Sequence, residues 1–183
     1  MPTVNDPDGT AMKVTEDGGG KVRAIVELEI EHASQINQDA YMWTSVPYST
    51  SANDTILALR NDSKTLTLHM TEVHINTGSV ASVYKVHLIT TAYTAAGTAV
   101  VGVNMNTEAS NKLADTTAVA DETGNTIAVA NIIRYVNLPV DGQEKIDLRG
   151  IDLTGDTAIA VDIVAASAAE ASVTFVGHYS EIV

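Results

Sequence analysis

The sequence predicts an all-β protein: a jelly-roll-like β-sandwich of about eight to ten antiparallel strands with an extended N-terminal arm. Three observations support this fold class. Apolar and polar residues alternate with a period of two in several segments, as expected for strands with one buried face. Hydrophobic residues make up 45% of the chain but aromatic residues only 4%, so the core must consist mainly of aliphatic, largely β-branched side chains. Short turns rich in Gly, Asn, Asp and Ser separate these segments.

The first 20 residues differ in composition from the rest of the 183-residue chain. They contain two of the four prolines and four of the twelve glycines, and such a segment is not expected to fold by itself. We therefore expect residues 1–20 to form an extended arm that a neighbouring subunit or another partner holds. Burial of Val4, Met12 and Val14 would offset the entropy of ordering this arm. Residues 21–183 are expected to form a single β-sandwich domain.

The alternation also locates the individual strands. KVRAIVELEIE at 21–31 alternates apolar with charged residues. The segments 54–60 and 64–75 flank the turn composition NDSK and are interpreted as a hairpin. The polar residues 106–126 are interpreted as a long loop, and 167–172 as at most one turn of helix. The remaining predicted strands span 82–93, 99–105, 127–138, 143–149, 157–166 and 171–183.

Charge and residue types exclude several functional classes. The formal net charge is −13 with only 10 Lys and Arg residues, which argues against binding to nucleic acid or to a membrane surface, because both need clustered cations. The chain has no cysteine, which excludes thiolate zinc sites and cysteine nucleophiles. No phosphate-binding loop, dinucleotide fingerprint or nucleophile elbow occurs, so we expect neither a cofactor nor enzymatic activity. The N-terminus lacks a secretory signal pattern, so synthesis in the cytoplasm is expected.

The stretch LHMTEVHI at 68–75 contains the most suggestive cluster of reactive side chains, His69, Glu72 and His74. On a straight strand, alternation points His69 to one face and the other two to the opposite face, so only Glu72 and His74 converge. His87 would join them if residue 74 pairs with residue 83, and would join His69 after a one-residue slip. The spacing does not match the helical zinc motif. For Glu72, His74 and His87 we therefore favour ordinary strand residues over metal ligands.

Tyr41 and Trp43 lie two residues apart and therefore share one face of a strand. If exposed, they form a platform on which a sugar ring could stack. If buried, they supply most of the aromatic mass of a core that is otherwise poor in aromatics. We favour the buried position.

Three acidic residues, Asp147, Asp152 and Asp156, lie in turn-rich sequence. They would bind a cation only if the loops brought them together. Solvated or turn-capping carboxylates are the commoner outcome and the one we expect.

Two segments resemble small virion structural proteins of tailed bacteriophages. They are AYMWTSVPYSTSANDTILALRNDSKTLTLHMTEVHI at 40–75 and GTAVVGVNMNTEASNKLADTTAVADETGN at 97–125. The matching residues are the turn Leu59-Arg60-Asn61 and the strand residues Gly97–Val100 and Val103–Asn106, followed by a polar loop rich in Ala and Thr. The resemblance covers about half of the chain and carries no catalytic signature, so it bears on fold more than on chemistry.

This resemblance implies a non-enzymatic virion protein with a jelly-roll-like domain. The first expectation is a capsid decoration (cement) protein that binds the outer shell and stabilises it through arm and sandwich contacts. Its partners would be the major capsid protein or other virion proteins, and it would form a homo-oligomer, preferably a trimer, on the capsid surface. The alternative is a tail, collar or head-fibre component that binds a carbohydrate or receptor through exposed Tyr41 and Trp43.

Overall fold

The computed structural model describes residues 39–49, 54–89, 97–106, 112–122, 131–165 and 170–181. The predicted arm at 1–20, with Val4, Met12 and Val14, lies outside these residues, as does the predicted strand at 21–31. The described elements are all β-strands, which confirms the predicted fold class. No helix in the described part of the chain is long and apolar enough to cross a membrane.

Twelve strands are described, and three of them, β2, β6 and β7, have only two residues each. The strands are β1 (Ala40–Thr44), β2 (Tyr48–Ser49), β3 (Thr55–Asn61), β4 (Leu66–Asn76), β5 (Ser82–Ile89), β6 (Thr98–Ala99), β7 (Val103–Asn104), β8 (Thr116–Glu122), β9 (Ile132–Leu138), β10 (Gln143–Leu153), β11 (Ala158–Ala165) and β12 (Glu170–Glu181).

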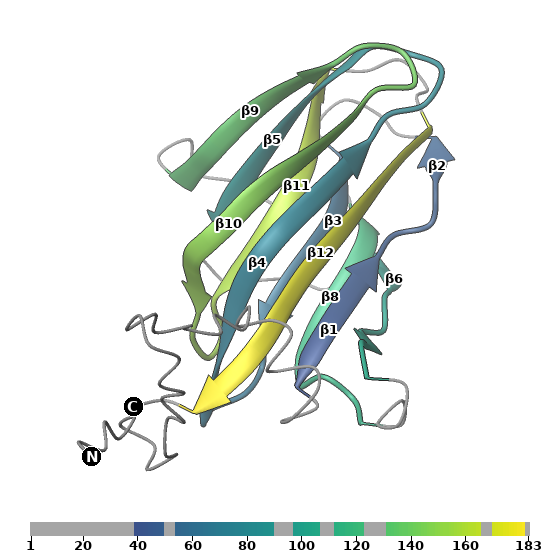
Figure 1. Ribbon diagram of the computed structural model, residues 1–183. Helices are drawn as coiled ribbons and strands as arrows, with labels where there is room; N and C mark the ends of the chain where they lie inside the picture. The colour runs from purple at the N-terminus through teal and green to yellow at the C-terminus, as the bar shows by residue number, and fades with distance from the viewer. Residues whose placement is uncertain are drawn as a thin grey trace, which may run out of the picture.

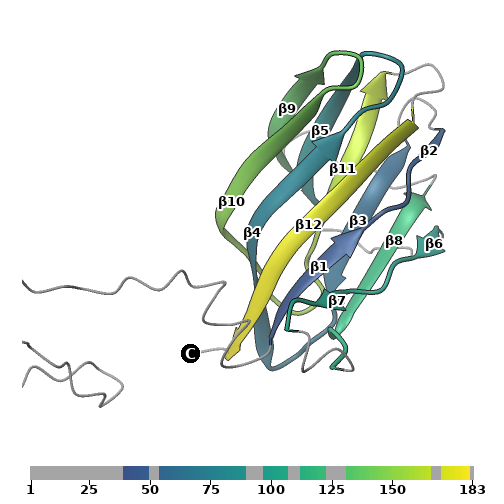
Figure 2. The same ribbon diagram turned by 45° about the vertical axis from the view of Figure 1, so that its right-hand side comes forward.

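The strands form two antiparallel sheets that pack face to face (Figures 1 and 2). The first, which we call the β4 sheet, has the strand order β10-β4-β12-β1-β7, and the short β2 also pairs with β12. The second, which we call the β5 sheet, has the order β6-β8-β3-β11-β5-β9. Figure 1 shows the β4 sheet in front of the β5 sheet, with the strands of the two layers running in similar directions. The molecule is therefore an aligned β-sandwich.

Eight of these strands have the connectivity of a jelly roll. They pair in a nested order, β1 with β12, β3 with β11, β4 with β10, and β5 with β9. This is the pairing of one long antiparallel hairpin whose halves then wrap into two facing sheets. Successive strands such as β3, β4 and β5 therefore alternate between the sheets, whereas hydrogen bonds join strands far apart in sequence.

The strands β6, β7 and β8 belong to an insertion between β5 and β9. β8 and β6 extend the β5 sheet beyond β3, and β7 extends the β4 sheet beyond β1. The insertion thus widens both sheets on the same side of the sandwich (Figure 2).

Side chains from both sheets form the main core. The largest fully buried ones include Tyr41, Trp43 and Phe175 from the β4 sheet and Tyr84 and Leu57 from the β5 sheet. Burying an aliphatic or aromatic side chain of this size contributes about 1.5–3 kcal/mol. The inward faces of the long strands follow the period-two pattern in the sequence, apart from bulges such as those in β3 and β4.

A smaller apolar cluster lies on the other face of the β5 sheet. It contains Ala58, Ile89, Val119, Ala158 and Ala160, all of them buried. Ala58 and Ala160 are flanked in sequence by residues of the main core, so alternation places them on the opposite face. The central part of this face of the β5 sheet is therefore also shielded from water.

One sequence prediction about connectivity is wrong. The segments at 54–60 and 64–75 do not form a hairpin, because β3 belongs to the β5 sheet and β4 to the β4 sheet. The four residues between these strands instead carry the chain from one sheet to the other. Buried Asn61 fixes this crossing, since its Nδ2 donates to the carbonyl oxygens of Leu66 at 2.9 Å and Leu153 at 2.7 Å.

The polar segment at 106–126 is not a loop throughout, because it contains β8. Thr116–Glu122 pairs with β3 along most of its length, and Ala118, Val119 and Ala120 are buried. Conversely, the strand predicted at 99–105 is reduced to the two-residue strands β6 and β7. The single helical turn proposed at 167–172 overlaps the start of β12 at Glu170.

Candidate functional site

A bulge in β4 places His69, Glu72 and His74 on the same face, contrary to the prediction. The pairing of β4 with β12 shifts register between Val176, opposite Glu72, and Gly177, opposite Met70, so Thr71 is an extra residue. The core side chains Met70 and Val73 are accordingly three residues apart instead of two. The split expected for a straight strand is wrong because the bulge reverses the alternation at this point.

Glu72 and His74 form one polar cluster on this outer face, together with Lys145 of β10. His74 Nε2 donates to Glu72 Oε1 at 2.7 Å, and Lys145 Nζ forms an ion pair with Glu72 Oε2. Burial alone would raise the pKa of Glu72, but the hydrogen bonds from Lys145 and His74 outweigh it and lower the pKa. Both Glu72 oxygens therefore already have cationic or N–H partners.

His69 belongs to a second cluster on the same face. Its Nδ1 lies 2.7 Å from Asp152 Oδ1 of β10, and its Nε2 lies 2.6 Å from Ser180 Oγ of β12. Its ring stacks on that of His178, with the ring centroids 5.3 Å apart and an interplanar angle of 27°. His69, His178 and Asp152 therefore come from three neighbouring strands and meet in one row.

His87 does not join either cluster, so its predicted convergence with Glu72 and His74 is wrong. It lies on β5 in the opposite sheet, fully buried beside Asp162, because β4 pairs with β10 and β12 and not with β5. Within the described ranges, no group of three or more His, Cys, Asp or Glu side chains is arranged to hold a metal ion.

Tyr41 and Trp43 are buried, which confirms the favoured core position and overturns sugar stacking. Their exposed fractions are 1% and 0%, and their ring centroids are 5.9 Å apart. The receptor-binding alternative loses the exposed aromatic platform on which it depended.

These aromatic residues anchor the insertion that carries β6, β7 and β8. Trp43 Nε1 donates to Thr116 Oγ1 at 3.0 Å. Gly102 lies so close to the indole that an added Cβ would be 2.5 Å from Trp43 Nε1. Tyr179 donates its hydroxyl to the carbonyl oxygen of Asp115 at 2.9 Å, and burial raises the pKa of that hydroxyl. The insertion is thus attached to the jelly roll by specific contacts.

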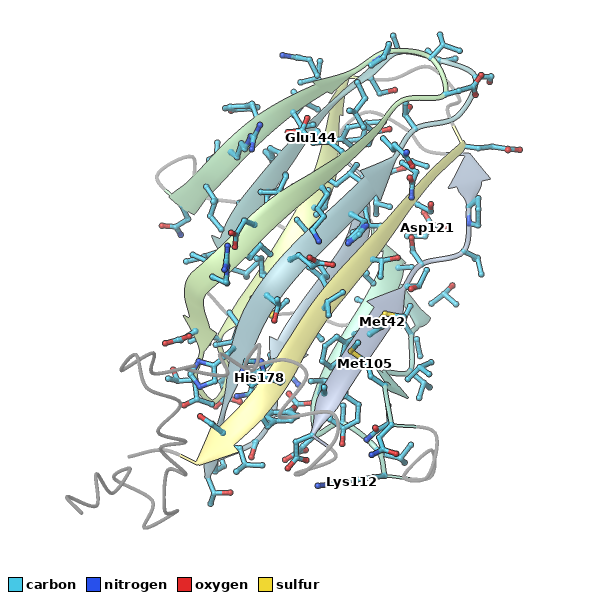
Figure 3. All side chains as sticks on the ribbon, in the orientation of Figure 1. Met42, Met105, Lys112, Asp121, Glu144 and His178 are labelled. Carbon is cyan, nitrogen blue, oxygen red and sulfur yellow. The ribbon has the colours of Figure 1, made fainter. Side chains whose placement is uncertain are left out.

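An exposed apolar strip runs along the outer side of β1 and β7. We call Met42, Val101, Val103 and Met105 the apolar edge; their exposed fractions are 38%, 68%, 64% and 39%. Met42 and Val103 are direct partners across the two strands, and the amide of Met105 donates to the carbonyl oxygen of Ala40 at 2.8 Å. Figure 3 shows the Met42 and Met105 side chains beside β1. Contiguous exposed apolar side chains of this kind mark interaction surfaces.

The three acidic residues of the turn-rich sequence do not converge. Asp152 contacts His69, Asp156 pairs with Lys64 across 2.5 Å, and Asp147 pairs with Arg149. Asp147 and Arg149 lie where the pairing of β10 with β4 changes register. The expected solvated, turn-associated role describes Asp156, which lies in the turn between β10 and β11. Asp147 and Asp152 both lie in β10, where Asp147 pairs with Arg149 and Asp152 contacts a histidine.

Arg149 should control the ionisation of Asp147. Hydrogen bonds from the Arg149 side chain and backbone lower the pKa of Asp147 from 3.8 to about 2. Arg149→Ala is therefore expected to return the pKa toward 3.8, as measured by ¹³C carboxyl shifts during an NMR pH titration. Because the folded-state pKa is depressed, this pair favours folding above pH 3.8 and the benefit is lost as the pH falls through about 2. A pKa that stays near 2 in the variant would show that Arg149 is not the cause.

Comparison with protein-family models, curated proteins and solved structures found no match to this chain. The functional interpretation therefore depends on the described geometry. Sequence reasoning singled out neither Ser180 nor His178, because their approach to His69 depends on strand pairing. The only sequence signal for them is the outward position of residues 178 and 180 in the alternation of the last strand.

Proposed function

We propose that this chain is a non-enzymatic structural protein of a bacteriophage virion, namely a capsid decoration protein that binds the outer shell. The observation that carries this proposal is the apolar edge along β1 and β7. Apolar side chains exposed together at a sheet edge are unfavourable in water unless a partner covers them. Two of the four are methionines, whose flexible side chains adapt to a partner surface.

The jelly roll and the charge of the chain also support a binding role. Strongly acidic proteins remain soluble while presenting an apolar surface, because net charge opposes non-specific association. The net charge of −13 thus fits a protein that stays soluble until it meets its specific partner. The two segments that resemble tailed-phage virion proteins include β1, β6 and β7, so the apolar edge lies within the resemblance.

In this mechanism the apolar edge packs against a capsid subunit. Copies of the chain form a homo-oligomer, preferably a trimer, around a symmetry axis of the shell. Residues 1–20 of each copy reach a neighbouring subunit, where Val4, Met12 and Val14 become buried. Several weak contacts made together give tight attachment, since each further contact is made at a high effective concentration.

Charging the apolar edge should abolish decoration. We expect Met42→Glu combined with Val103→Glu to weaken binding to purified shells of the source virus by at least about tenfold, because each carboxylate would be desolvated in the interface. Co-sedimentation of the protein with shells, followed by electron microscopy of the particles, measures this. The matched control is Ile133→Glu with Tyr135→Glu, which places two charges on the exposed β9 edge of the other sheet.

The same assay distinguishes the parts of the proposal. A chain lacking residues 2–20 should fold but bind poorly if the arm contributes. Equal loss of binding in the β9 control would show that the effect is general repulsion and not a property of the apolar edge. Absence of the chain from purified virions, tested by mass spectrometry, would rule out the decoration role itself.

A further inference from the structure

Two histidines and a carboxylate that contacts one of them lie in one row across the β4 sheet. His178 of β12 is the direct cross-strand partner of His69 of β4, and His69 is in turn the direct partner of Asp152 of β10. Directly opposed side chains on neighbouring antiparallel strands have Cβ atoms about 4.5–5.5 Å apart. The two imidazole rings are therefore neighbours on this face, with their centroids 5.3 Å apart. Figure 3 labels His178 on the lower part of β12.

The hydrogen bonds of His69 indicate which of its ring nitrogens carries the proton. Asp152 is a carboxylate and can only accept, so the proton of neutral His69 lies on Nδ1 and is donated to Asp152 Oδ1 at 2.7 Å. The lone pair is then on Nε2, where it accepts the hydrogen bond from Ser180 Oγ at 2.6 Å. A histidine that donates one N–H to a carboxylate and keeps a lone pair on the other nitrogen is the common arrangement of a metal ligand.

We propose that His69 and His178 bind a divalent transition-metal ion such as Zn²⁺, and that Asp152 orients His69 for this purpose. The ion takes the position on His69 Nε2 that the Ser180 hydroxyl holds, and water completes the coordination. Imidazole nitrogen suits Zn²⁺, Cu²⁺ and Ni²⁺ and not Mg²⁺ or Ca²⁺. The net charge of −13 raises the concentration of cations around the protein. About one quarter of the His69 side chain, 27%, is exposed, which leaves the ion a route of entry.

The same side chains also have the order Ser-His-Asp of a hydrolytic triad, but the surroundings favour metal binding. A triad needs backbone N–H groups free to stabilise an oxyanion near the serine. Ser180 lies on β12, which is paired with β4 at this position, and the neighbouring Tyr179 amide donates to the carbonyl of Asp39. The two interpretations make opposite predictions for Ser180→Ala: a triad loses its nucleophile, whereas a metal site loses only a competitor for His69 Nε2.

Isothermal titration of the tag-free full chain with ZnCl₂ tests the proposal. The expected result is one ion per chain, with binding at least about tenfold weaker in His69→Gln and in His178→Gln. Asp152→Asn should weaken binding by about 10–100-fold, because Asp152 fixes the ring and increases its basicity. Ser180→Ala should bind equally well or more tightly. His74→Gln is the matched control, since it removes a histidine from the same face of the same strand, and should bind as the unmodified chain does.

A second measurement distinguishes the loss of a ligand from the loss of folded structure. It is needed because His178 is only 4% exposed and its replacement can disturb the fold. Electron paramagnetic resonance of the Cu²⁺-loaded chain should show two nitrogen ligands, and only one in the folded His69→Gln variant. Absence of Zn²⁺ binding at millimolar concentration would overturn the proposal. So would binding that persists without His69, binding lost in His74→Gln, or binding lost in Ser180→Ala.

Discussion

Replacing Trp43 with alanine is expected to lower the free energy of unfolding by about 3–5 kcal/mol, as for other buried large aromatic side chains. Trp43 is fully buried between the sheets, and Gly102 of the insertion packs directly against its indole ring. The substitution leaves a cavity at the point where the insertion meets the jelly roll. Urea denaturation followed by circular dichroism measures the change. For a domain of this size it corresponds to a fall in Tm on the order of 10 °C.

The loss of stability in Trp43→Ala should be concentrated in the insertion. Amide hydrogen exchange should speed up at Val100, which donates to Ala118, and at Met105, which donates to Ala40, more than at the centre of β11. Trp43→Phe serves as the matched control, because it keeps most of the apolar volume but removes the N–H donor to Thr116. We expect it to cost about 1–2 kcal/mol. A Trp43→Ala variant that loses less than about 1 kcal/mol would contradict the central position of this residue in the core.

Trp43 also illustrates what the sequence could predict. Period-two alternation and the scarcity of aromatics together predicted that Tyr41 and Trp43 are buried, because a chain with one Trp and one Phe has few other large side chains for its core. The same alternation located most of the long strands. Their inward faces follow from local patterns, which depend only on residues two apart.

Contacts between strands were predicted poorly, because they depend on which strands pair with each other and in which register. NDSK has the composition of a hairpin turn, yet β3 and β4 lie in different sheets. In a jelly roll, the partner of a strand is commonly its nested counterpart far along the chain, and composition carries no information on that distance. The cluster of His69, Asp152 and Ser180 could therefore not be recognised from the sequence.

The bulge at Thr71 had the largest effect on the predicted site. One extra residue moved Glu72 and His74 to the same face as His69, which the straight-strand prediction had separated. Threonine is an ordinary strand residue, so nothing in the sequence marks this position. The bulge is visible only in the register of β4 against its neighbours and in the core positions of Met70 and Val73.

Replacing Asp162 with alanine is the second substitution for which we expect a large effect, about 3–5 kcal/mol of lost stability. Asp162 is fully buried on the face of the β5 sheet opposite the main core. Its Oδ1 accepts a hydrogen bond from Thr55 Oγ1 at 2.8 Å. Its Oδ2 lies 3.1 Å from His87 Nε2 and 3.4 Å from Lys85 Nζ, both on β5. Removing the carboxylate takes the counter-charge from Lys85 and an acceptor from Thr55 in a region shielded from water.

The ionic part of this effect can be separated from the hydrogen bond. Asp162→Asn preserves the shape and the acceptor for Thr55 but removes the charge that faces Lys85. If the ion pair matters, Asp162→Asn and Lys85→Met should each destabilise the protein, because each removes one charge of the pair while the other stays buried or partly buried. The double variant has neither charge, so it should lose less stability than the two single variants lose together.

A double-mutant cycle from urea denaturation measures this difference. We expect a coupling free energy between Asp162 and Lys85 within the range of about 0.5–3 kcal/mol found for residues in contact. If the stability lost in the double variant equals the sum of the losses in the two single variants to within about 0.3–0.5 kcal/mol, the two charges do not interact. Thr55→Val tests the hydrogen bond alone, and we expect it to cost about 1.5–3 kcal/mol, since its acceptor is a charged carboxylate. The outer face of the β5 sheet would then hold a buried polar network in which charge pairing and hydrogen bonding contribute separately.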